Sequence, residues 1–253
     1  MIVLLLLLNA NISFLVPLIT FFILLLLIIE MEVNISFSVN KQLFKKNPEE
    51  SAIGREIISN SIELIHTLGL DGFTFKKLAG KIEHTEATIY RYFENKQMLL
   101  LYIVNWYWLY LDFLIEFKIQ NLKDPKHKIN EIIAILSQNL SETKLTSNYN
   151  LGAIFQIINR EGNKVYLHTE VKEINKIQLY KPYKDLCSKI AAIFQSYNPQ
   201  YPYSHSLAST LIETSHLQIF FAENLPRLTD VNEKNKQNYT HSFLSDIIFK
   251  SLN

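Results

Sequence analysis

The segment from Thr74 to Lys96 constrains the fold of this chain more than any other, because it reads as two short helices joined by a tight turn. Thr74 is placed to cap the first helix, and Thr85 is placed to cap the second. The apolar residues recur at helical spacing, so both helices can be buried together: Leu78, Ala79 and Ile82 on the first, and Ile89 and Phe93 on the second. This arrangement is typical of a helix-turn-helix unit that reads DNA.

The second helix of this unit leaves a short polar surface toward solvent. We expect the following side chains to be exposed there: Glu86, Ala87, Thr88, Tyr90, Arg91 and Tyr92. A surface rich in hydrogen-bond donors suits the major groove of DNA.

The amino-acid composition favours helix along the whole chain. The 253 residues are 48% hydrophobic and 12% aromatic, which is enough for one large core or two small ones. Six glycines and seven prolines are few, and no regular alternation of apolar and polar residues bounded by turn signals indicates a sheet. We therefore predict an all-α protein.

Charge and cysteine content set limits on partners and compartment. The net charge is only +1, so a nucleic-acid partner has to be argued from local positioning rather than from bulk charge. Between Lys41 and Lys96, basic and acidic residues nearly balance. The single cysteine, Cys187, cannot form an internal disulfide and fits a reducing compartment, where we expect an inert core thiol.

The first thirty residues leave two interpretations open. Met1 to Ile29 carry no charged side chain and are long enough for a membrane helix. In that interpretation Lys41, Lys45 and Lys46 keep the rest of the chain in the cytoplasm, anchored to the inner membrane. In the other, translation starts at Met31, the apolar stretch is a gene-calling artefact, and the protein is cytoplasmic. A secretory signal fits poorly, because no Lys or Arg precedes the apolar run.

After a linker at residues 31–47, a helix should run from Asn47 to about Leu68. Asn47 can cap it, Pro48 suits its first turn, and Gly69 stops it. Further helices are expected at about 95–120, 124–140, 149–159, 165–195 with a bend at Pro182, 204–225 and 239–252. The helix at about 95–120 is apolar on most sides, and because it carries acidic residues we assign it to the protein core rather than to lipid.

This order of elements resembles the TetR family of transcriptional regulators. The resemblance covers about residues 50–105 and rests on Leu78-Ala79 and on the run from Thr85 to Lys96, Thr-Glu-Ala-Thr-Ile-Tyr-Arg-Tyr-Phe-Glu-Asn-Lys. It implies a three-helix DNA-binding head at residues 48–97 and a larger helical ligand-binding and dimerisation domain at residues 98–253.

The resemblance also assigns roles to single residues. It implies that the DNA backbone phosphates are contacted by Thr74, Tyr90, Tyr92 and Lys96. It implies that the base edges are faced by Thr85, Glu86, Ala87, Thr88 and Arg91. The alternative is that the tyrosines are ordinary packing and that Lys96 is a solvated surface residue. One departure is Glu83-His84, at a turn where the family usually has glycine, which would place a non-glycine residue at positive φ.

In the C-terminal domain the resemblance implies a dimer and a small-molecule effector. A four-helix interface between subunits would use Leu207, Leu211, Ile212, Ile219, Phe220 and Phe221, unless these fill the core of a single subunit. Candidates for lining a ligand cavity are Trp106, Tyr110 and Phe113, although such aromatic clusters are more often plain core.

The sequence thus predicts a DNA-binding regulator, a dimeric repressor released from its double-stranded operator by a small molecule. The alternative is a membrane-anchored helical scaffold or receptor whose DNA-binding head has degenerated. An enzyme is disfavoured because the seven histidines show no HExxH spacing and no glycine-rich phosphate loop or CxxC motif occurs. We expect no catalytic residue, no metal site and no cofactor.

Overall fold

Helices make up all the regular structure in the part of the chain that the computed structural model describes, which is residues 37–138, 149–167, 169, 171–232, 234 and 238–253. The all-α prediction is therefore confirmed for these residues. Our interpretations of the first thirty residues fall outside them. The elements are η1 (Lys41–Leu43), η2 (Pro48–Glu50), α2 (Ala52–Gly72), α3 (Phe75–Lys81), α4 (Glu86–Tyr90), α5 (Lys96–Ile119), α6 (Pro125–Leu136), α7 (Leu151–Glu161), η4 (Gly162–Val165), α8 (Val171–Lys176), α9 (Lys181–Tyr197), α10 (Ser204–Asn224), η5 (Pro226–Leu228) and α11 (Tyr239–Leu252).

The first long helix begins later than we predicted. Asn47 caps only the short turn η2, where its Nδ2 donates to the Glu50 carboxylate at 3.0 Å. Ser51 is then extended, with φ −147°, and its hydroxyl caps α2 by accepting from the Gly54 N–H at 3.1 Å. The two elements turn back so tightly that a Cβ on Gly54 would lie 2.2 Å from the Pro48 carbonyl oxygen. This close approach needs glycine and ends the continuous helix we expected.

Gly69 interrupts α2 where the sequence predicted the helix to stop. Its φ of 69° and ψ of 167° are not helical, and the chain adds one further turn to Gly72. The Gly69 carbonyl then accepts from the Phe73 N–H at 3.1 Å. The break sets the direction in which the chain enters α3.

The helix α5 is the central element of the described protein. Asn95 caps it by accepting from the Met98 N–H, and the helix packs against α2, α6, α7 and α9. It is the one described helix that is long and apolar enough to cross a membrane, but 78% of its most apolar window is buried inside the protein. This burial is expected for the core helix of a helical domain, as we assigned it.

Two of the expected C-terminal helices differ from the prediction. The helix expected to reach residue 140 ends at Leu136, where the Ser137 hydroxyl bonds the Ile133 carbonyl. The single helix expected at 165–195 is wrong, because the chain forms η4, α8 and α9 there. Gln178, with φ 61°, separates α8 from α9, and Pro182 lies in the first turn of α9, where its missing N–H is harmless.

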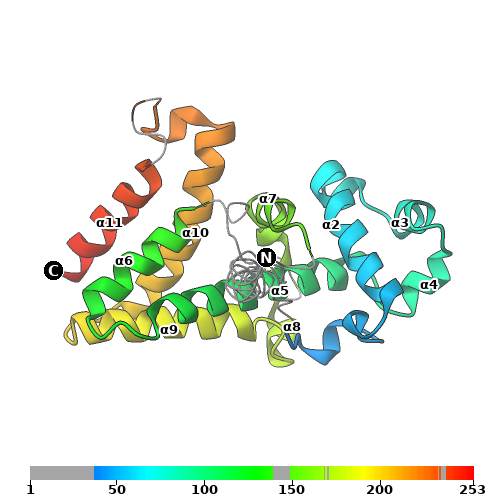
Figure 1. The fold of residues 1–253 in the computed structure, drawn as a ribbon, viewed down its shortest axis with the longest axis horizontal. Helices are drawn as coiled ribbons and strands as arrows, with labels where there is room; N and C mark the ends of the chain where they lie inside the picture. The colour runs from blue at the N-terminus through cyan, green and yellow to red at the C-terminus, as the bar shows by residue number, and fades with distance from the viewer. Residues whose placement is uncertain (1–36, 139–148, 168, 170, 233, 235–237) are drawn as a thin grey trace, which may run out of the picture. The chain divides into compact units, whose positions relative to one another are not determined.

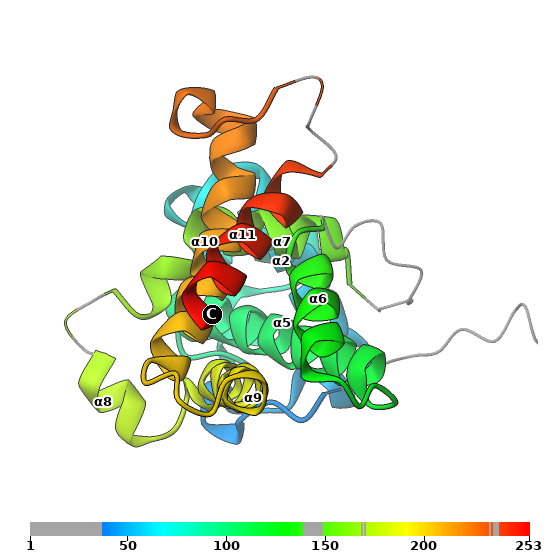
Figure 2. The same ribbon diagram turned by 90° about the vertical axis from the view of Figure 1, so that its left-hand side faces the viewer.

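The C-terminal helices pack around α9 (Figure 1). α9 contacts α5, α6 and α10, and α11 lies against both α10 and α6. Figure 2 shows α9 nearly end-on beneath α6, α10 and α11. At the other end of the described unit α3 and α4 form the head with α2, and α2 packs along α7. The head and the C-terminal helices belong to one compact unit, so our division at residue 97 stays a prediction.

Candidate nucleic-acid interface

The two helices of the predicted reading unit form with the caps that the sequence indicated. The Thr74 hydroxyl accepts from the Lys77 N–H at 3.2 Å, and the Thr85 hydroxyl accepts from the Thr88 N–H at 3.3 Å. All five apolar residues proposed as the inner face are buried: Leu78, Ala79, Ile82, Ile89 and Phe93. The packing of α3 on α4 is therefore fixed by the residues that define the motif.

The turn between these helices contains a strained residue. Glu83 has φ 54°, in the left-handed region that favours glycine. The next N–H, of His84, closes the end of α3 by donating to the Ala79 carbonyl at 3.0 Å. The departure noted in the sequence therefore places a residue with a Cβ at positive φ, with backbone strain as the result.

The outer face of α4 is available to a partner. The side chains of Thr85, Glu86, Ala87 and Arg91 are exposed, and Thr88 is half-buried. Tyr90 is 45% exposed, and its ring packs edge-on against Phe75 with centroids 5.0 Å apart. This contact holds one side of the tyrosine ring in place, while nearly half of the side chain stays exposed.

Tyr92 is buried, so our expectation that it is exposed is wrong. Only 3% of its surface is accessible, and its hydroxyl shares a 2.8 Å hydrogen bond with the Ser51 hydroxyl at the start of α2. Its carbonyl accepts from the Lys45 N–H at 2.8 Å. Tyr92 thus joins the end of the reading unit to the chain that leads into α2. Its contact with a DNA phosphate stays a prediction, and the hydroxyl that would make this contact is already bound to Ser51.

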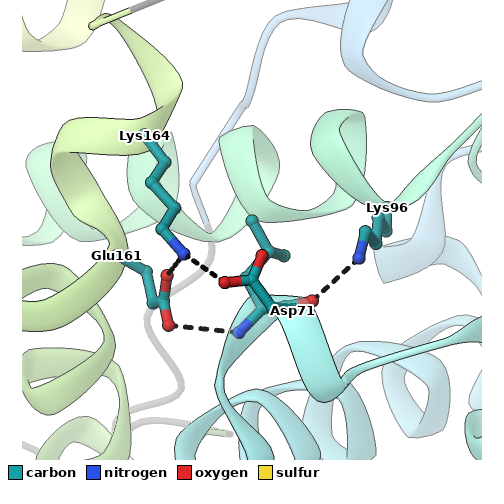
Figure 3. A network of polar contacts seen from close by, with 5 residues as sticks. Asp71, Lys96, Glu161 and Lys164 are labelled. Carbon is teal, nitrogen blue, oxygen red and sulfur yellow. Dashed lines mark hydrogen bonds and ion pairs between the residues drawn. The ribbon is translucent and has the colours of Figure 1, made fainter.

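Lys96 also has a partner within the protein. Its Nζ donates to the carbonyl oxygen of Leu70, just beyond the break in α2, at 2.9 Å (Figure 3). The Lys96 side chain is half-buried, so it is not a fully solvated surface residue. A contact of its ammonium group with a DNA phosphate would compete with the hydrogen bond to Leu70.

The same stretch of α2 is held from the other side by α7. Glu161 accepts from the Leu70 N–H at 3.1 Å, and its second carboxylate oxygen lies 2.8 Å from the Lys164 ammonium. Lys164 also reaches Asp71 at 3.0 Å, as Figure 3 shows. No sequence pattern indicated these partners, because they join segments far apart in the chain.

A second carboxylate ties the entry of the head to the C-terminal helices. One oxygen of Glu49, in η2, accepts from the Tyr102 hydroxyl at 2.9 Å and from the Tyr149 hydroxyl at 2.6 Å. Tyr102 lies on α5, and Tyr149 directly precedes the cap of α7. The turn before α2 is therefore joined to α5 and to the residue that leads into α7, while the last turn of α2 is joined to the end of α7.

The family of the reading unit follows from a match across this region. Residues 57–103 match the model of the bacterial regulatory proteins of the tetR family. The match spans most of α2, the reading unit and the start of α5. These residues form a TetR-family helix-turn-helix domain. TetR-family regulators are DNA-binding transcription factors rather than enzymes, and the matched residues give this chain the N-terminal DNA-binding domain of such a regulator.

Solved structures share this TetR-like fold at low sequence identity. A TetR-family regulator from Agrobacterium tumefaciens is 15% identical with a TM-score of 0.55, and the match covers 79% of this chain and 98% of that one. The fatty acid degradation regulator FadR from Bacillus halodurans is 15% identical with a TM-score of 0.54, covering 78% and 97%. AibR, in complex with isovaleryl coenzyme A and operator DNA, is 13% identical with a TM-score of 0.52, also covering 78% and 97%. No curated protein matches the chain.

The helices after the head contain the aromatic residues we proposed as a ligand pocket. Trp106 and Tyr110 are buried and stacked, with ring centroids 5.4 Å apart. The ring of Phe37 lies within 6.3 Å of both, and 6.1 Å from Phe113. Phe37 therefore occupies the position next to these rings, and a ligand there would have to displace it. Their pocket role stays a prediction.

The sequence analysis missed a polar cluster in this domain. His216 is 7% exposed, its Nε2 lies 2.7 Å from the Tyr107 hydroxyl, and its Nδ1 lies 2.8 Å from the Ile212 carbonyl. One turn away, Glu213 accepts from the hydroxyls of two tyrosines, Tyr166 and Tyr183. The nearby Cys187 is buried, and burial raises the pKa of its thiol to about 11, as suits the inert thiol we expected.

Proposed function

We propose that this TetR-family regulator is a dimeric repressor that leaves its operator when a small molecule binds the C-terminal helices. The observation that carries the DNA-binding part is the division of α4 into a buried inner face and an exposed outer one. Ile89 is fully buried, whereas Thr85, Glu86 and Arg91 are exposed. A helix anchored in this way can enter a major groove without losing its own packing.

We place the dimer interface on α10 and α11, where fewer of the six proposed interface residues are accessible than the sequence suggested. Three of the six candidates fill the core of the single chain: Leu207, Leu211 and Ile212. The other three, Ile219, Phe220 and Phe221, are half-buried, and Leu217 beside them is 39% exposed. Contact with a second copy would cover this apolar surface. It would also let two reading helices meet successive major grooves, which lie about 34 Å apart.

The ligand response would travel through contacts that join the head to the C-terminal helices. α5 carries the head directly, Glu161 of α7 binds the last turn of α2, and Glu49 of η2 binds Tyr149 just before α7. A ligand that binds one arrangement of α5 and α7 better than another would shift the orientation of the heads. AibR has been solved with both a coenzyme A ester and operator DNA, which supports this kind of regulation here.

The test is selection of genomic DNA fragments by purified protein spanning residues 31–253, repeated at several salt concentrations. We expect enrichment of a palindromic site with two spaced halves, and an affinity that falls steeply with salt. Arg91→Ala should change sequence preference, whereas Tyr90→Ala and Lys96→Ala should weaken binding to all sequences alike. Folded protein that enriches no site would contradict the proposal.

A further inference from the structure

Most basic residues of the head already have partners inside the protein. In each of four cases the side chain is bound to an oxygen within the head: Arg55 to the Glu49 carbonyl, Lys77 to the Gly72 carbonyl, Lys81 to the Glu63 carboxylate and Lys96 to the Leu70 carbonyl. A phosphate contact by any of these four would therefore share or compete for donors that are already engaged within the head.

Lys45 and Lys46 differ, and they lie beside the end of the reading unit. Both side chains are exposed, and within the described residues neither forms an ion pair. The Lys45 N–H donates to the carbonyl oxygen of Tyr92 at 2.8 Å. The Lys46 ammonium lies 5.3 Å from the centroid of the Tyr92 ring, a cation–π contact. The main chain that carries both lysines is thereby fixed against the residue that follows Arg91.

The nearest acidic residues in sequence are bound elsewhere. Glu49 accepts from the hydroxyls of Tyr102 and Tyr149 on the side of the C-terminal helices. Glu50 accepts from the side-chain amide of Asn47. Two exposed ammonium groups on a positioned loop, neither in an ion pair among the described residues and with the adjacent carboxylates oriented toward other donors, favour an anion rather than a neutral partner.

We propose that Lys45 and Lys46 form a clamp on the DNA backbone that extends the contact beyond the reading helix. The clamp would grip phosphates next to the major groove that α4 enters, because Tyr92 fixes it to the end of that unit. It also gives Tyr92 a part in DNA binding that does not need its hydroxyl to be exposed. This inference rests on the proposed function.

The experiment compares the salt dependence of operator binding for the unaltered protein, Lys45→Ala/Lys46→Ala and a matched control. The control is Lys118→Ala/Lys123→Ala, which removes two exposed lysines that lie beyond the head, at and after the end of α5. Affinity is measured by fluorescence anisotropy on one selected operator and on one unrelated duplex. We expect the slope of log K against log salt to become shallower by about 0.9 for each lysine that contacts a phosphate, on both duplexes, and to stay unchanged in the control. Lys45→Arg/Lys46→Arg should restore it, because charge is kept.

The outcomes separate this inference from the proposed function. If the unaltered protein binds its operator and the Lys45→Ala/Lys46→Ala slope does not change, the proposed clamp is wrong, whereas the proposed function as a DNA-binding regulator is unaffected. If the two lysines instead promote binding to vesicles of anionic phospholipid, with an unchanged slope on DNA, they serve a membrane surface and the clamp is again wrong. If folded, unaltered protein binds no DNA at low salt, both proposals fail.

Discussion

The carboxylate of Glu161 accepts a hydrogen bond from the backbone N–H of Leu70, which precedes it by 91 residues. Leu70 is buried, and its N–H follows Gly69, whose backbone breaks the helical conformation of α2. The end of α7 therefore completes the structure of α2 within the head. Lys164 joins the same carboxylate to Asp71 (Figure 3).

Removing this carboxylate should destabilise the protein more than removing its ion pair. Glu161→Ala leaves a buried N–H without a partner, and we expect the free energy of unfolding to fall by about 1–3 kcal/mol. Glu161→Gln keeps an acceptor and should lose less. Lys164→Met removes only the partly exposed ammonium, for which about 0–1 kcal/mol is expected. Urea denaturation would measure all three, and equal losses for Glu161→Ala and Lys164→Met would contradict this assignment.

Two glycines of the head should respond to alanine with opposite signs. At Gly69 the φ of 69° disfavours any side chain, and a Cβ would lie 3.2 Å from a carboxylate oxygen of Glu161. Gly69→Ala should lower the free energy of unfolding by about 1 kcal/mol or more. Gly80, inside α3, has open space around its Cβ position, so Gly80→Ala should raise it by about 0.5–1 kcal/mol. Thermal denaturation of both variants tests the backbone assignment, and a stabilised Gly69→Ala would refute it.

Strain at Glu83 predicts a stabilising substitution. Its φ of 54° costs a residue with a Cβ about 1 kcal/mol or more, so Glu83→Gly should raise the free energy of unfolding by about that amount. Glu83→Ala keeps the strain and should bring no such gain. Both variants also remove a negative charge next to the reading unit, so similar gains in operator affinity at low salt are expected for the two. If Glu83→Ala were as stable as Glu83→Gly, the gain in stability would come from the loss of the charge and not from relief of backbone strain.

The buried imidazole of His216 predicts acid sensitivity. Burial lowers the pKa of His216, and the hydrogen bond to Ile212 and the charge of Glu213 oppose this shift. Below a pH of about 6.5, His216 binds a proton in the unfolded chain but stays neutral in the folded chain. The free energy of unfolding therefore decreases as the pH falls. His216→Gln should reduce the pH dependence of unfolding between about pH 7.5 and 5.5, by up to about 1.4 kcal/mol per pH unit at the acid end. The exposed His205→Gln serves as the control for removing a histidine at the surface.

The proposed dimer surface can be tested with one charge. Leu217→Glu places a carboxylate among the half-buried apolar residues of α10, so we expect the protein to sediment as a monomer and to bind its operator more weakly. Leu167→Glu is the matched control, because Leu167 is 75% exposed and lies outside α10 and α11. A Leu217→Glu protein that still sediments as a dimer would place the interface elsewhere.

The sequence predicted the features whose causes are local. The caps at Thr74 and Thr85 each bond an N–H three residues on, so the pattern alone contains them. The environments of Tyr92 and Lys96 could not be predicted, because their partners lie 41 and 26 residues away. Likewise, no local signal marked the left-handed residue that separates α8 from α9.

The contacts of Phe37 have a consequence for how the head can move. Phe37 packs against Trp106 of α5, and Asn40 donates to the carbonyl of Ile177 before α9, so the chain touches the C-terminal helices before it enters the head. It returns to those helices through α5. The head is therefore joined to the C-terminal helices at both of its ends, and α2 also packs along α7 between them. A head held in this way is expected to change its angle together with α5 and α7, so that regulation would turn the head rather than release it.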